Sequence, residues 1–195
     1  MTSPRLRFAA LFFVALALLA GPRPAAALFL GDVVPDTRKG EWEAGLALSG
    51  TLGASTLFAS YGLSDTKALR GELGLGNLGS TEFGLVYRAT VGGFKLGGKD
   101  SKWGLLGGLY AGGAAGASYT TLVASPGLSV PLNNQFTVYG GLALVVLSLS
   151  GAAATTNSLL FDAGTSFAVN RNFKFGGEIH FSTGSALVLW AKYKF

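Results

Sequence analysis

The sequence predicts an all-β fold: a transmembrane antiparallel up-and-down β-barrel of about ten strands, with eight as the alternative. Three observations lead to this prediction. Apolar residues alternate with small or polar residues in runs of about ten, as in half-exposed strands. Hydrophobic residues make up 49% of the 195-residue chain, yet no stretch after residue 27 has the ~18 consecutive apolar residues of a spanning helix. Short turns rich in Asn and Asp separate the runs.

The first 27 residues are expected to be a cleaved signal peptide. MTSPRLR gives a positively charged start, residues 8–20 (FAALFFVALALLA) are apolar, and Ala25-Ala26-Ala27 offers small residues for cleavage. The apolar run falls short of the ~20 residues that span a bilayer, which disfavours a membrane anchor. Residues 28–41 would then be a short periplasmic N-terminal lead-in, and residues 42–195 the barrel.

The first five expected strands place apolar residues on one face and charged or small residues on the other. Trp42 and Leu46 oppose Glu43, and Tyr87 opposes Arg88. All strand charges in this half fall on the same side. The five strands are residues 42–49, 57–63, 69–75, 82–91 and 102–110.

The second half continues the alternation, with one irregular run. In residues 136–148 (FTVYGGLALVVLS), Val145 and Leu147 would face the polar side, and for this reason the strand number stays between eight and ten. The expected strands here are residues 122–130, 136–148, 159–169, 173–182 and 187–195.

A repeated pattern pairs the strands into hairpins. LSDTKALRGELGL, LNNQFTVYGGLAL and VNRNFKFGGEI each place a short turn before a Gly-containing strand. The period of 33 to 37 residues fits two strands of ~9–11 residues and two connections. Turns are expected at 64–66, 92–101, 131–135 and 170–172. The opposite loops, near 51–53, 77–79, 112–118, 150–157 and 183–185, are short or rich in small residues.

The apolar face is expected to contact lipid. A soluble sandwich with this sequence would expose faces of Gly, Ala and Ser with few charges. In hydrocarbon, only a closed barrel satisfies every strand backbone group, so the polar faces would line a lumen. Aromatic residues on the apolar face near the turns are typical of a girdle at one membrane interface. They are Trp42, Tyr61, Tyr87, Trp103, Phe136, Phe173, Tyr193 and Phe195.

Composition excludes several classes of function. The chain has no Cys and one His, so thiol chemistry is absent and a metal site or cofactor is not expected. Removing Arg5, Arg7 and Arg23 with the leader leaves 12 basic and 10 acidic residues, a net charge of +2. With no basic cluster, nucleic acid is not an expected partner.

The C-terminal stretch LVLWAKYKF carries a resemblance. Its alternate apolar positions and terminal aromatic resemble the assembly signal of bacterial outer-membrane β-barrel proteins. The resemblance implies recognition by the barrel-assembly machinery through Leu187, Leu189, Tyr193 and Phe195. It also implies a bacterial outer-membrane location, with both termini periplasmic because an even strand number returns the chain to its starting side.

One set of residues raises the question of catalysis. A turn at residues 170–172 would set Asp162 opposite His180, with Ser182 two residues further along the same face. Side chains at i and i+2 begin ~6.6 Å apart at Cα, which strains a Ser-His hydrogen bond. The His-x-Ser pattern resembles that of outer-membrane lipid A deacylases, but Thr183 stands where an Asn normally follows. An Asp162–His180 pair without enzymatic activity is therefore expected.

The remaining strand charges are expected to face the lumen, with Glu43 near Lys192 and Lys194 where the barrel closes. They are Glu43, Arg70, Glu72, Glu82, Arg88, Lys102, Lys174, Glu178, Lys192 and Lys194. Two roles stay open: ion pairing across the wall, or ion selectivity.

These observations favour an integral outer-membrane barrel, not an enzyme, with a structural envelope role or a packed lumen. The alternative is a narrow passive channel for small solutes, because inward Gly and Ser residues leave volume in the lumen. A lipid A-modifying enzyme is the third hypothesis. Short loops offer little surface for a specific partner, so the expected partners are membrane lipid and the assembly machinery, and the chain is expected to be a monomer.

Overall fold

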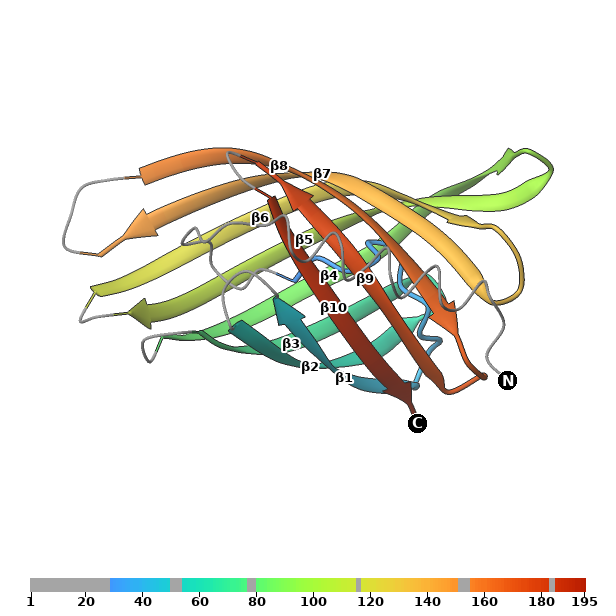
Figure 1. Ribbon diagram of the computed structural model, residues 1–195, viewed down its shortest axis with the longest axis horizontal. Coiled ribbons are helices and arrows are strands. Elements are labelled where there is room, and N and C mark those ends of the chain that lie inside the picture. Colours follow the sequence, from blue (N-terminus) through green and yellow to red (C-terminus); the bar gives the residue numbers. More distant parts are fainter. Residues whose placement is uncertain (1–28, 50–53, 77–79, 115–116, 151–154, 183–184) are drawn as a thin grey trace.

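Ten antiparallel strands form one closed barrel in the computed structural model (Figure 1). The structure describes residues 29–49, 54–76, 80–114, 117–150, 155–182 and 185–195. No helix in these ranges is long and apolar enough to cross a membrane. The expected signal peptide, residues 1–27, lies outside them. The strands are β1 (Trp42–Ser49), β2 (Ala54–Ser64), β3 (Lys67–Leu75), β4 (Thr81–Leu96), β5 (Lys99–Ala114), β6 (Ala117–Pro131), β7 (Phe136–Leu149), β8 (Thr155–Ala168), β9 (Phe173–Phe181) and β10 (Ser185–Lys194).

Each strand pairs with its neighbours in sequence, and β1 pairs with β10 to close the ring. The closing ladder runs from Glu43 opposite Lys194 to Ser49 opposite Val188. At its end, the Phe195 amide donates to the Trp42 carbonyl at 2.9 Å, so the start of β1 and the end of β10 lie together. The predicted up-and-down barrel is confirmed, and the strand number is ten.

The irregular run at 136–148 is a full strand, β7, that pairs along its length with β8. Val145 and Leu147 share the inward face with buried Tyr139 and Ala143. Val145 packs against buried apolar side chains inside the barrel. The run broke the alternation because this part of the lumen is apolar.

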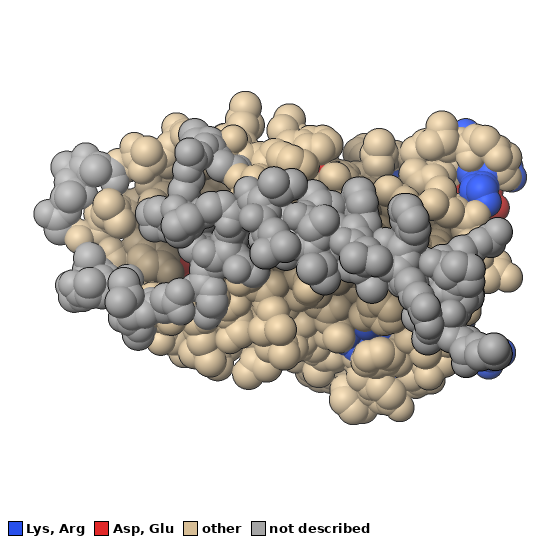
Figure 2. Space-filling view, viewed as in Figure 1, with Lys and Arg blue, Asp and Glu red and all other residues tan. Residues whose placement is uncertain are grey.

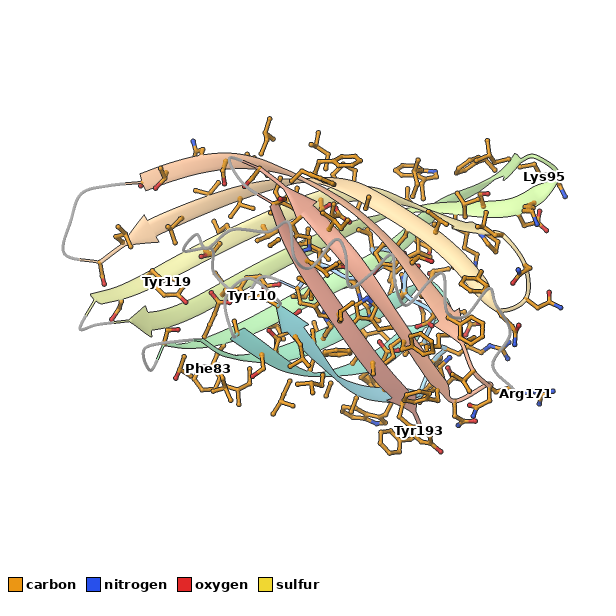
Figure 3. All side chains as sticks on the ribbon, viewed as in Figure 1. Phe83, Lys95, Tyr110, Tyr119, Arg171 and Tyr193 are labelled. Carbon is orange, nitrogen blue, oxygen red and sulfur yellow. The ribbon has the colours of Figure 1, made fainter. Side chains whose placement is uncertain are left out.

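Alternation along the strands divides the side chains between two faces. Outward residues such as Leu85, Leu109 and Leu159 are half exposed or more. Figure 2 shows a wall made mostly of uncharged residues. In Figure 3, Phe83 and Tyr193 project from this wall, whereas Tyr110, which is 1% exposed, lies inside.

Two of the predicted turns are built around an Asn side chain. Asn133 Oδ1 accepts the amides of Gln135 and Phe136, and Asn170 Oδ1 accepts those of Asn172 and Phe173. Such bonds replace the ladder partners that the backbone loses where a strand ends. These turns, at the end of the barrel that carries the C-terminus, lie where the sequence predicted them.

The loop expected at 92–101 is mostly strand, which corrects the prediction. β4 continues to Leu96 and β5 begins at Lys99, so the turn is Gly97-Gly98. Both glycines have positive φ, +56° and +78°, as a two-residue hairpin turn requires. The hairpin projects past the neighbouring strands (Figure 1). Its glycines and charges obscured the alternation in the sequence.

The loops at the other end are also shorter than expected where they are described. β5 runs to Ala114, β6 begins at Ala117, and β8 begins at Thr155. Residues 51–53, 77–79 and most of 183–185 lie outside the described residues.

The aromatic residues predicted as a girdle gather on the outer wall toward the C-terminal end of the barrel. Trp42 and Tyr61 stack across β1 and β2 with ring centroids 4.8 Å apart, and Phe136 and Phe167 do the same across β7 and β8. Tyr193 and Phe195 meet edge to face at 5.2 Å. Amphipathic rings in such a band suit the boundary between lipid and water.

A charge at mid-height on the outer wall should be costly in lipid. Leu109→Arg is expected to lower the free energy of unfolding by ~2–4 kcal/mol, and Leu63→Arg, next to the turn after β2, by at most about 1 kcal/mol. Denaturant unfolding in phospholipid vesicles measures both variants. Equal costs at the two positions would contradict a wall that spans the bilayer.

Candidate functional site: the lumen and the segment inside it

Residues 29–37, called here the luminal segment, lie inside the barrel (Figure 1). Phe29, Leu30, Val33, Val34 and Thr37 are at most 6% exposed. The sequence placed these residues in a periplasmic lead-in, and the structure instead puts them within the ring of strands. The stretch FLGDVV is apolar enough to favour burial and too short and irregular to form another strand.

An apolar belt holds the middle of the luminal segment. Leu30 and Val33 pack into a cluster of buried inward side chains from β4 to β7, with Val145 and Leu160 against it. Apolar burial of this kind stabilises by ~25 cal/mol per Å² removed from water. The belt therefore both anchors the segment and fills the lumen. Its wall members are Val86, Leu106, Tyr110, Val123 and Ala143.

The Phe29 ring occupies a second, aromatic pocket. Its centroid lies 5.0 Å from the Phe58 ring and 6.3 Å from the Trp190 ring. The Arg70 guanidinium lies over the Phe29 ring, 4.8 Å from its centroid. Trp190 Nε1 donates to the Tyr139 hydroxyl at 2.9 Å, which fixes that side of the pocket.

Two buried charges bind the backbone of the luminal segment. Glu178 accepts the Leu30 amide at 3.2 Å and the Gly31 amide at 2.9 Å. Arg70 Nη2 donates to the Phe29 carbonyl at 2.8 Å and the Leu30 carbonyl at 3.1 Å. Arg70 also pairs with Glu72 at 2.6 Å. Buried charges need partners of this kind, and here backbone groups supply part of the pairing.

Asp32 is held by both its backbone and its side chain. Arg88 Nη1 donates to the Asp32 carbonyl at 3.2 Å, while Arg88 Nη2 donates to Glu43 Oε1 at 3.0 Å. The Ser129 hydroxyl donates to Asp32 Oδ2 at 2.8 Å. This residue thus links the segment to β4 and β6.

Asp36 ties the end of the luminal segment to β9 and β10. Its carboxylate pairs with Lys174 and with Lys192, the latter at 2.8 Å, and Lys194 Nζ donates to its carbonyl at 2.7 Å. Burial alone would raise the pKa of Asp36, but the two lysines hold that pKa well below its ordinary value. The stabilisation is therefore present above the unfolded pKa near ~4 and is lost as the pH falls through the folded pKa.

Inward glycines form hollows that rings and the luminal segment fill. A Cβ on Gly84 would lie 2.4 Å from the Tyr110 ring, and a Cβ on Gly164 would lie 2.5 Å from the Tyr139 ring. A Cβ on Gly127 would lie 2.8 Å from Val33 of the segment. The expectation that such glycines leave a water path is thus corrected at these positions, because side chains from elsewhere occupy the volume.

The structure brings most of the predicted luminal charges together. Glu43, Arg70, Glu72, Glu82, Arg88 and Glu178 are buried inside the barrel. Lys174, Lys192 and Lys194 lie half buried near the C-terminal end, and Lys102 is exposed there. At the closing seam Lys192 pairs with Glu43 at 3.0 Å, and Lys194 pairs with Glu41 at 3.2 Å.

The three catalytic candidates do not form a relay. The register sets Asp162 opposite His180, as the turn predicted. His180 Nε2, however, lies 2.8 Å from Glu178 Oε1, so its partner is Glu178 and the expected Asp162–His180 hydrogen bond is not made. Both Asp162 carboxylate oxygens are buried without a hydrogen-bond partner among the described residues. Ser182 is exposed at the end of β9.

A cavity of about 580 Å³ opens between the luminal segment and the wall at the C-terminal end of the barrel. Its charged lining includes Asp32, Asp36, Arg38, Lys102, Lys174 and Lys192. In the described ranges, no three His, Asp or Glu side chains are arranged to hold a metal ion. The arrangement binds a peptide backbone and forms ion pairs with it.

Sequence reasoning missed the luminal segment, with its Asp32 and Asp36, and several of its partners on the wall, among them Phe58, Ser129 and Tyr139. One signal was present: LFLGDVV is apolar, follows the leader directly and precedes the first turn. Such a stretch needs burial, and a barrel interior with few bulky inward residues is the nearest place for it.

Removing the Glu178 carboxylate should destabilise the barrel. Glu178→Ala leaves two backbone amides, Tyr139 and His180 without their acceptor, and it should lower the free energy of unfolding by about 3–5 kcal/mol. Glu178→Gln, which keeps an acceptor oxygen, should cost less. Denaturant unfolding in detergent gives these values.

Glu82→Ala is a suitable control, because it removes a buried carboxylate that does not bond to the luminal segment. If Glu178→Ala cost no more than Glu82→Ala, the segment would not be held through Glu178.

No protein-family model and no curated protein sequence matches the chain. Solved structures do. A de novo designed transmembrane β-barrel has 12% identity and a TM-score of 0.44, over 83% of this chain and all of that one. The KdgM porin has 9% identity and a TM-score of 0.43, over 80% of this chain and 99% of that one.

Ail from Yersinia pestis, in a phospholipid nanodisc, has 18% identity and a TM-score of 0.40, over 82% of this chain and all of that one. At such identities the likeness concerns fold alone. In the molecule itself, a closed ten-stranded ring carries apolar side chains outside and an aromatic girdle at one end. The fold is a closed, ten-stranded antiparallel β-barrel with an apolar outer wall.

Proposed function

We propose that this chain is an integral outer-membrane protein with a structural role in the envelope, whose barrel is kept closed by its own luminal segment. The observation that carries the proposal is the double anchoring of that segment. An apolar belt surrounds Leu30 and Val33, and Arg70 and Glu178 bind the backbone beside them. An open pore would need these groups to face water.

The membrane setting rests on the outer wall. Exposed Leu, Phe, Trp and Tyr side chains cover it, and a soluble protein rarely exposes apolar patches above a few hundred Å². In a bilayer these apolar side chains would contact lipid instead of water. The closed ring suits this setting, since it leaves no unpaired strand edge in hydrocarbon. We infer that both termini lie on the periplasmic side, because a signal peptide would deliver the chain from that side and the start of β1 lies beside the end of β10.

Biogenesis through the barrel-assembly machinery is part of the proposal. Leu189, Tyr193 and Phe195 are exposed on the outer face of the last strand, open to a partner. Leu187 has the same parity and is 4% exposed. We also propose that the protein is a monomer, that membrane lipid surrounds it and that it has no enzymatic role.

A narrow channel for small solutes is the second candidate. The charged cavity of about 580 Å³ at the C-terminal end favours it, as a vestibule that solutes would enter. Conduction past the vestibule would require the luminal segment to leave the apolar belt. A lipid A-modifying activity has no comparable support, because Ser182 is exposed at a strand end and His180 is engaged by Glu178.

Single-channel recording in planar bilayers tests the closed barrel. The refolded full-length protein is expected to insert without stable conductance steps, because the luminal segment fills the ring. Insertion is checked separately by flotation with vesicles and by heat-modifiable gel mobility. Glu178→Ala, which loosens the segment, should produce steps that the parent lacks.

Stable steps in the unmodified protein, with an ion selectivity that shifts in Lys192→Glu, would establish conduction and overturn the closed barrel. Lys192 is the informative position, since its ammonium lies between Asp36 and Glu43 beside the vestibule.

A further inference from the structure

The lumen recognises the backbone of the luminal segment as well as its side chains. Arg70 donates to two successive carbonyls, those of Phe29 and Leu30, and Glu178 accepts two successive amides, those of Leu30 and Gly31. The cationic Arg70 binds backbone carbonyls and the anionic Glu178 binds backbone amides. Together they favour a peptide whose backbone runs in the direction that the segment has here. Arg70 is 1% exposed and Glu178 is 1% exposed, so both lie in a water-poor site where charge-assisted hydrogen bonds are strong.

We propose that the lumen is a peptide-binding site, with the chain's own residues 29–37 as its resident ligand. The ligand class is a bent, irregular peptide with an aromatic, an aliphatic, a Gly and an Asp in succession, followed by Val at the fifth position and Asp at the eighth. The inference rests on the closed barrel proposed above and goes further: the site selects this peptide by non-covalent contacts, so it also binds the peptide when it is supplied as a separate molecule.

Two sites, an aromatic pocket and the apolar belt, hold three apolar side chains of the peptide. Phe29 enters the pocket of Phe58, Trp190 and the Arg70 guanidinium. Leu30, 0% exposed, and Val33, 2% exposed, enter the apolar belt. Removing any one of these side chains would leave a cavity that the rigid wall fills poorly.

Gly31 is required for two independent reasons. Its φ is +62°, a conformation that residues with a Cβ rarely adopt. A Cβ there would also lie 3.0 Å from the Phe29 ring and 3.1 Å from Arg70 Nη1, so one of the two would have to move. The site therefore discriminates Gly from Ala at this position.

Polar contacts bind the two Asp side chains of the peptide. Ser129 donates to the Asp32 carboxylate, and Lys174 and Lys192 pair with the Asp36 carboxylate. Recognition thus extends from Phe29 to Asp36 and involves wall residues from most of the ring.

The covalent link to β1 makes contacts of its own, outside the contacts from Phe29 to Asp36. The Gly40 amide donates to the Gly62 carbonyl at 2.9 Å, and the Lys39 amide donates to Asp65 Oδ1 at 3.3 Å. Residues 38–40 are exposed, and as a short tether they also raise the effective concentration of the segment, to the order of millimolar. Cutting it leaves every contact from Phe29 to Asp36 in place.

The test keeps the chain complete until the barrel has folded. A recognition sequence for a site-specific protease is inserted between Lys39 and Gly40, and the refolded barrel is cut in detergent. Trp42→Phe and Trp103→Phe leave Trp190, 6.3 Å from the Phe29 ring, as the only tryptophan reporter in the mature chain. The cut segment should stay with the barrel through gel filtration, and excess FLGDVVPDTRK carrying a fluorophore should replace it in a saturable manner.

Peptide variants and barrel variants give the specificity. Phe29→Ala and Gly31→Ala peptides should bind at least tenfold more weakly than the parent, as should the parent peptide to an Arg70→Ala barrel. An Arg171→Ala barrel is the matched control and should bind the parent peptide unchanged, since Arg171 is exposed in the turn between β8 and β9 and no bond joins it to the segment in the described part of the chain.

Loss of the segment after cutting, with no saturable binding of the labelled peptide to a barrel that is still folded by gel mobility, would overturn the peptide site. Equal binding of a scrambled peptide would do the same. Either result is compatible with the closed barrel, provided that the uncut protein shows no conductance in planar bilayers. Conductance of the uncut protein would instead contradict the closed barrel proposed above.

Discussion

Hydrocarbon offers no partner to a backbone amide or carbonyl, and this constraint determines the shape of the molecule. Each unpaired group in lipid costs several kcal/mol, so the strands must pair along both edges. The ladder between β1 and β10 meets the requirement by joining the first strand to the last. Up-and-down connections follow, because hairpins are the shortest way to place ten strands side by side. Once the ring is closed, every strand has one face toward lipid and one toward an interior that must also be filled.

The interior is where charge, packing and the luminal segment become interdependent. Arg70, Arg88 and Glu178 sit among apolar side chains, and a buried charge that lacks partners is strongly destabilising. The wall supplies Glu72 and Glu43 to the arginines, while the segment supplies carbonyls to both arginines and amides to Glu178. In return, inward glycines such as Gly127 leave the room that the segment needs. Removing the luminal segment would therefore leave buried charges of the wall without partners and the hollows at the inward glycines unfilled. Removing the wall charges would leave backbone groups of the segment without partners.

Local alternation was sufficient to predict the strands, the Asn turns, the girdle and the register that sets Asp162 opposite His180. These features depend on the two-residue period of a strand and on neighbours in the chain. His180 is opposite Asp162 in register but bonds to Glu178, two residues away on its own strand, so the register alone does not identify its partner. Many other contacts of the lumen join residues that are distant in the sequence, which no local pattern contains. The luminal segment was missed for a related reason: residues 29–37 have no strand period, and some of their partners are far away in the sequence. Lys192 is 156 positions from Asp36, and Trp190 is 161 positions from Phe29. The turn at Gly97-Gly98 was predicted too long, as residues 92–101, because glycine is common in both strands and turns of this chain.

The tether decides how the luminal segment reaches its site. Residues 38–40 bridge Thr37, buried in the barrel, and Glu41 at the start of β1, and the Gly40 and Gly62 backbones bond at 2.9 Å to hold this connection at the C-terminal end of the ring. So short a link confines the segment to entry from that end or to capture before the ring closes. The second route has a physical advantage, since β1 follows the segment directly and pairs with β10, the strand that carries Trp190 and Lys192. Contacts of Phe29 with Trp190 and of Asp36 with Lys192 would then draw the first and last strands together as the closing ladder forms.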